Sequence, residues 1–241
     1  MMIKNWTTLG VVLKRSNLGE ADRLLTIYTE KLGKISAIAK SARKPKSSFA
    51  SHLEPGTIIQ FELAHGKTFY IITSAKTIKH YDFGQMEKLR ALFHWLELAD
   101  KISVAHEPQP ALFDQIADGL AICASQPQRC YLYELGLFGT IGYKLVLDVC
   151  VVGREKLAEE GNGFSARLGG VVCAIHDQKA DDLVKISVSA IKLLRLAQTR
   201  TYDTLEKVTI PDKVMAEARQ IVALCRYEII EQELKSDRIY G

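Results

Sequence analysis

The spacing of apolar residues changes near residue 81 from a period of two to a helical period, and this change most constrains the fold. Upstream of it, apolar and polar residues alternate in five short segments, which is typical of half-buried strands. Five short strands within about 75 residues fit a small closed barrel better than an open sheet with long edges. We therefore predict a barrel whose strands cover residues 9–13, 23–29, 34–40, 58–63 and 68–74.

Downstream of residue 81 the pattern predicts helices. Pro110, Pro127 and Pro211 mark three expected helix starts, because the first turn of a helix does not need the N–H that proline lacks. The helix from residue 127 is expected to end near residue 142, and a further helix is expected over residues 185–198. The expected buried stripe of the first helix comprises Met86, Leu89, Phe93, Leu96 and Ile102.

These patterns predict a β + α chain of two domains. A barrel domain over residues 1–80 is followed by an all-helical domain over residues 81–241. Residues 144–182 are glycine-rich and irregular, and we expect them to form a small insertion in the helical domain. The length of 241 residues allows each domain its own core.

Positive charge is concentrated in the barrel region. Residues 1–80 hold 13 Lys and Arg against 5 Asp and Glu, whereas the rest of the chain holds 19 against 23. No acidic residue lies between Glu30 and Glu54, a stretch that includes most of the long connection over residues 41–55. Such a connection in a compact barrel is usually functional, and an uncompensated positive field favours a polyanionic partner.

The expected contacts are to the phosphates and bases of a nucleic acid. Lysine and arginine contact phosphates, and an aromatic ring in the connection can stack on a base. The predicted phosphate contacts are Lys34, Lys40, Arg43, Lys44 and Lys46, with Lys14, Arg15 and Lys31 behind them, and the predicted stacking residue is Phe49. If about five cations contact a single strand, the logarithm of affinity falls with the logarithm of salt at a slope near −3.5.

The chain resembles the RecO family of bacterial DNA-repair mediator proteins. The resemblance lies in GEADRLLTIYTEKLGKISAIAK, SARKPKSSF and HLEP within residues 19–55, and more weakly in YELGLFGTIGY and ELKSDRIY. It implies an oligonucleotide-binding (OB) barrel and a helical domain that bind single- and double-stranded DNA and anneal complementary strands. It also implies two protein partners. They are RecR, with which such proteins help RecA onto DNA, and the acidic C-terminal tail of the single-stranded DNA-binding protein.

The resemblance also implies a zinc site, of which this sequence keeps only a part. Family members often carry two CxxC pairs, but here the pairs read CVVG at 150–153 and CAIH at 173–176. The remaining candidate ligands are Cys150, Cys173 and His176, while Asp148 or water would be a poor fourth ligand for a structural zinc. We therefore expect a degenerate, zinc-free insertion held by valine packing, and no cofactor.

Nothing in the sequence assembles an enzyme, because it contains no GxxxxGK[ST], GxSxG or HExxH motif and no GxGxxG after a strand. Cys123, Cys130 and Cys225 lie in apolar helical patterns and are expected to be buried, reduced thiols. The opening MMIKNWTTLG lacks the apolar core of a signal peptide. We expect a cytoplasmic, nucleoid-associated protein.

Two other functions remain open. The same cations would serve an RNA-binding barrel in translation or ribosome assembly, and a preference for RNA over DNA of equal sequence would reveal it. An interaction scaffold with incidental charge would fail to anneal complementary strands.

Overall fold

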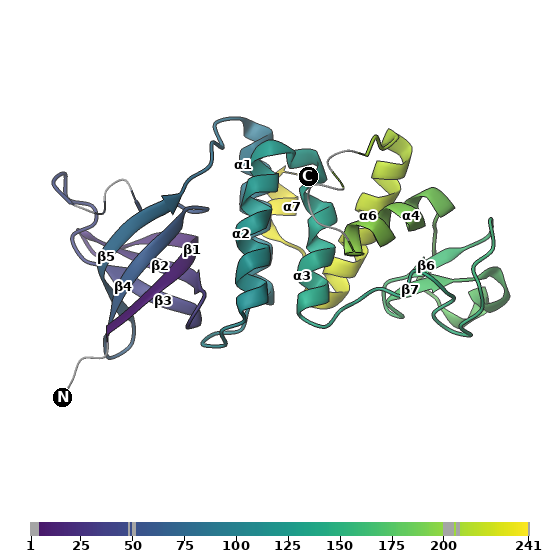
Figure 1. Cartoon of the computed structure of the whole chain (residues 1–241), viewed down its shortest axis with the longest axis horizontal. Coiled ribbons are helices and arrows are strands. Elements are labelled where there is room, and N and C mark those ends of the chain that lie inside the picture. The colour runs from purple at the N-terminus through teal and green to yellow at the C-terminus, as the bar shows by residue number, and fades with distance from the viewer. Residues whose placement is uncertain (1–4, 48, 50–51, 200–204, 206–207, 241) are drawn as a thin grey trace. The chain divides into compact units, whose positions relative to one another are not determined.

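We describe the protein from a computed structural model, shown in Figure 1, which describes residues 5–240 apart from 48, 50–51, 200–204 and 206–207. The chain divides into two compact units, Met1–Gln128 with Leu234–Gly241, and Arg129–Glu233. The first compact unit therefore contains the helices up to residue 128 as well as the barrel. The domain boundary predicted at residue 80 instead marks the place where strands give way to helices.

The predicted five-stranded barrel is confirmed. Its strands are β1 (Asn5–Leu18), β2 (Asp22–Thr29), β3 (Gly33–Ala39), β4 (Ile58–His65) and β5 (Tyr70–Lys79). They close in the order β1-β2-β3-β5-β4, with β4 paired to β1 (Figure 1). The β3–β5 pair is parallel and the others are antiparallel. This is the Greek-key arrangement of a small OB barrel.

The barrel core follows the alternation read from the sequence, with one exception in β1. Ile59, Phe61 and Leu63 are fully buried in the core, while their neighbours Gln60 and Glu62 are exposed. In β1, however, Val12 joins the barrel core, whereas Val11 and Leu13 are buried outside it. Helices α1 (Met86–Ile102) and α2 (Pro110–Ser125) both contact β1, so this strand is covered on two faces.

The packing of α1 on α2 corrects the buried stripe predicted for α1. Trp95 is fully buried and its indole N–H donates to the carbonyl of Ile116 at 3.0 Å. A Cβ at Gly119 would collide with that ring, so a glycine is required there. The stripe therefore centres on Trp95, with Leu96 buried as predicted, whereas Phe93 is 39% exposed beside a hollow of about 320 Å³. Short helix α7 (Lys235–Tyr240) contacts α1.

The secondary structure after residue 126 differs from the prediction in two places, the helix expected from Pro127 and the insertion. The segment expected as one helix consists of a 3-10 helix, Pro127–Tyr133, and helix α3 (Glu134–Thr140). A sheet of order β7-β6-β8 forms here from β6 (Gly163–Ser165) and β7 (Gly170–Val172) of the insertion and β8 (Val184–Lys185) just after it. A 3-10 turn, Ala174–Lys179, follows β7, and the long helices are α4 (Val188–Thr199) and α6 (Asp212–Ile230).

The cysteine prediction holds in part. Cys123, Cys130 and Cys225 are all buried, and Cys225 is a free thiol whose pKa burial raises to about 12. Cys123 and Cys130 are disulfide-bonded, so the expectation of reduced thiols is wrong for these two. In the described part of the chain, no helix combines the length and apolar character needed to cross a bilayer.

Candidate nucleic-acid interface and metal cluster

The connection after β3 begins as a loop that is tied to the β1–β2 turn, and we call residues 40–47 the basic loop. Ser41 adopts a positive φ of 56°, and its N–H donates to Asp22 at 2.7 Å. Arg43 donates from its backbone N–H to the carbonyl of Ala21 at 2.9 Å and from its guanidinium to the carbonyl of Gly19 at 3.1 Å. These bonds hold the start of the loop in a defined position.

Four cations project from the basic loop into solvent. Lys40, Arg43, Lys44 and Lys46 are all exposed, while Ala42 between them is buried in the barrel core. Among the residues that the structure describes, none of the four forms an ion pair with a carboxylate. Their positive field is therefore uncompensated locally, as an interface for phosphates requires.

The other predicted phosphate contacts lie in a different setting. Lys14 and Lys34 both pair with Asp100 of α1, and Arg15 pairs with Glu54. Lys31 donates from its ammonium group to the carbonyl of Thr7 at 2.9 Å. A cation held by a carboxylate contributes less field to a polyanion. DNA contact by these four side chains stays a prediction, and the basic loop carries the main argument.

Phe49, predicted to stack on a base, is half-buried and packs against the barrel core. An aromatic side chain in this position contributes apolar burial to the loop, together with fully buried Leu53. Base stacking by Phe49 stays a prediction and is not needed for phosphate binding.

The insertion gathers four metal-ligand groups where the sequence suggested three. Atoms of Cys150, Glu155, Cys173 and His176 all lie within 4.8 Å of one another. His176 Nδ1 is 3.6 Å from Cys150 Sγ, 3.4 Å from Cys173 Sγ and 3.5 Å from Glu155 Oε2. The sequence left Cys150, Cys173 and His176 as candidate ligands, and the structure adds Glu155 as a fourth, so this cluster could hold a metal ion.

The three separations measured from His176 Nδ1 fit a tetrahedral zinc. With Zn–S near 2.3 Å and Zn–N or Zn–O near 2.0 Å, neighbouring ligand atoms lie about 3.3–3.8 Å apart. Gly153, at the place of a lost cysteine, leaves the required space, because a Cβ there would collide with Glu155 and His176. The chain then turns at Arg154, with φ 68°, so that the Glu155 carbonyl accepts from the Cys150 N–H at 2.8 Å.

The surroundings of Cys150 favour the thiolate that a metal requires. Burial raises the pKa of the Cys150 thiol, but the N–H groups of Cys173, Gly153 and Val152 stabilise its anion and lower the pKa to about 7. Asp148, considered as a substitute ligand, instead pairs with Arg195 at 3.0 Å. Glu155 could not be predicted as a ligand from the sequence, because it lies outside the CxxC spacing. The turn after Gly153 places its carboxylate beside the two cysteines and His176.

Comparison with known proteins covers nearly the whole chain. Residues 1–81 match the family described as Recombination protein O N terminal, and residues 84–238 match Recombination protein O C terminal. The DNA repair protein RecO of Dehalococcoides mccartyi strain CBDB1 is 30% identical over 237 residues, 96% of this chain and 93% of that protein. The proteins of the same name from Bifidobacterium animalis subsp. lactis strain AD011 and Caldanaerobacter subterraneus subsp. tengcongensis are 31% and 25% identical. They cover 84% and 95% of this chain, and 86% and 94% of their own lengths. With both halves matched in order, the chain belongs to the RecO family of DNA repair proteins.

Proposed function

We propose that this RecO protein is a recombination mediator that binds single- and double-stranded DNA through the basic loop and anneals complementary strands. With RecR, it assists RecA in displacing the single-stranded DNA-binding protein, whose acidic C-terminal tail is a second partner. It acts in the bacterial cytoplasm, at the nucleoid. Family membership supports the pathway and its partners.

The observation that carries the proposal is the set of four exposed cations on a tethered loop of an OB barrel. Lysine and arginine neutralise backbone phosphates without reading sequence, which suits a protein that must act on any strand. Annealing needs no covalent step, because neutralising the repulsion between two strands is sufficient to accelerate their pairing. The proposal therefore assigns no catalytic residue.

The test is a salt titration of binding to a single-stranded oligonucleotide, combined with an annealing assay. Four loop cations predict that log affinity falls with log salt at a slope of about −2.8, with annealing lost at high salt. A slope near zero would exclude the interface. Tighter binding to RNA of the same sequence, without annealing of DNA, would instead favour the translation or ribosome-assembly function.

We further propose that Cys150, Glu155, Cys173 and His176 hold one structural zinc, which cross-links the two halves of the insertion. The supporting observations are the ligand separations of 3.4–3.6 Å and the space left by Gly153. A zinc ion with four protein ligands has no open position for catalysis, so its contribution is to folding.

Elemental analysis of the purified protein is expected to give about one zinc per chain. Glu155→Gln should weaken zinc retention against a chelator by at least about tenfold, since even losing a group that only orients a ligand costs that much. Glu159→Gln removes a nearby exposed carboxylate and should retain zinc like the wild type. Protein refolded with zinc that still carries none would disprove the site.

A further inference from the structure

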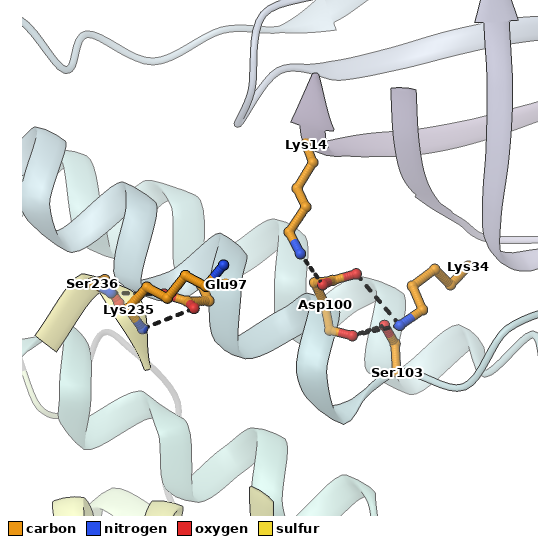
Figure 2. Close-up of polar contacts among 7 residues, drawn as sticks. All are labelled: Lys14, Lys34, Glu97, Asp100, Ser103, Lys235 and Ser236. Atoms are coloured by element: carbon orange, nitrogen blue, oxygen red, sulfur yellow. Dashed lines mark hydrogen bonds and ion pairs between the residues drawn. The ribbon is translucent and has the colours of Figure 1, made fainter. Parts of the chain in front are cut away.

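Asp100, near the end of α1, contacts lysines from two barrel strands at once. Lys14 on β1 pairs with Asp100 Oδ2, and Lys34 on β3 lies 3.4 Å from Asp100 Oδ1 and also donates to its backbone carbonyl (Figure 2). Ser103 donates to the same carbonyl at 3.4 Å. One carboxylate thus holds two cations that the sequence pattern assigned to phosphates.

The two lysines differ in how firmly they are held. The Lys34 side chain is 21% exposed and is also fixed by the backbone carbonyl, whereas the Lys14 side chain is 53% exposed. The Asp100 side chain is 13% exposed. Lys14 can therefore leave the pair for solvent at little cost, because exposed ion pairs are weak. Two ammonium groups on one carboxylate also leave one positive charge uncompensated.

A phosphate oxygen and a carboxylate oxygen offer a lysine the same kind of bond. We infer that Asp100 is an internal competitor of DNA phosphate, which occupies Lys14 in the free protein and is displaced when a strand reaches the barrel. This inference rests on the proposed DNA binding. It adds that the Asp100 carboxylate lowers the affinity of the protein for DNA. The carboxylate lowers affinity for every DNA sequence alike, since it acts on a phosphate contact.

The test compares Asp100→Asn with the wild type in binding a single-stranded oligonucleotide at fixed salt. Asparagine keeps the shape of the side chain but cannot hold an ammonium group by charge. Affinity should rise about three- to tenfold, the range expected when the pair with half-exposed Lys14 no longer competes with phosphate. In the Lys14→Gln background the same substitution should bring less than about a third of that gain, because the released cation is absent.

A matched control removes a carboxylate that holds no lysine. Glu107 is exposed, its backbone lies against Gly33, and among the described residues its side chain has no hydrogen bond or ion pair. Glu107→Gln should leave DNA affinity within about twofold of the wild type, which separates release of Lys14 from a general loss of negative charge.

The outcomes separate this inference from the proposed function. In one outcome the wild type binds DNA in a salt-dependent way while Asp100→Asn shows no rise in affinity. In another the affinity rises equally in the Lys14→Gln background. Either result would overturn the role of Asp100 as a competitor and leave the proposed DNA binding intact. No binding by the wild type would overturn both. If Asp100→Asn does not fold, the salt dependence of DNA binding by the Lys14→Gln variant tests the inference instead. The inference expects its salt slope to be shallower by about 0.7, and an unchanged slope contradicts it.

Discussion

Reversing three charges of the basic loop, in Lys40→Glu/Arg43→Glu/Lys44→Glu, should weaken binding to single-stranded DNA by about a hundredfold or more and abolish annealing. Each substitution removes a phosphate contact and adds a charge that repels the strand, so the losses accumulate. All three side chains are exposed, and among the described residues only Arg43 bonds a backbone carbonyl through its side chain. The barrel should therefore remain folded, and fluorescence anisotropy at low salt measures the loss.

The matched control applies the same change of charge to the second unit. Lys144, Lys179 and Lys213 are exposed, and none forms an ion pair among the described residues. Their triple change to glutamate should reduce affinity by less than about threefold, because these lysines are not among the proposed phosphate contacts and ordinary salt screens the effect of net charge alone. Equal losses in the two triple variants would mean that net charge, and not the basic loop, governs binding.

Arg226→Met should destabilise the second unit by about 3–5 kcal/mol, because it removes the guanidinium that pairs with a buried carboxylate. The Arg226 guanidinium of α6 donates to both oxygens of Glu134 on α3, at 3.0 and 2.8 Å. The Glu134 side chain is completely buried and that of Arg226 is 10% exposed. Urea unfolding followed by circular dichroism measures the loss in free energy of unfolding.

Two further variants show whether burial is the cause. Glu134→Gln/Arg226→Met removes the buried charge itself and should recover more than half of the lost stability. Arg167→Met breaks a pair with Asp181 in which the side chains are 60% and 83% exposed, and should cost less than about 1 kcal/mol. If Arg226→Met is as mild as Arg167→Met, the α3–α6 pair does not hold this unit together.

The exposed cations of the basic loop could be predicted from the sequence, because charge and exposure are local properties. A run of cations without carboxylates between Glu30 and Glu54 has few ways to be buried, so Lys40, Arg43, Lys44 and Lys46 are exposed as the pattern indicated. The partners of Lys14 and Lys34 were not visible, since Asp100 lies more than sixty residues away along the chain. Glu155 was missed for a similar reason, as its approach to His176 depends on the turn after Gly153.

The sequence by itself determined the barrel and the starts of α2 and α6, because strand alternation and proline positions follow from local backbone geometry. Only the tertiary structure decided which face of α1 is buried, where a wide indole needs the gap at Gly119. The tertiary structure also decided which lysines and arginines pair with carboxylates, and that Glu155 lies beside Cys150 and Cys173. Side-chain pairing between distant segments depends on the packed arrangement of the chain, which no local pattern contains.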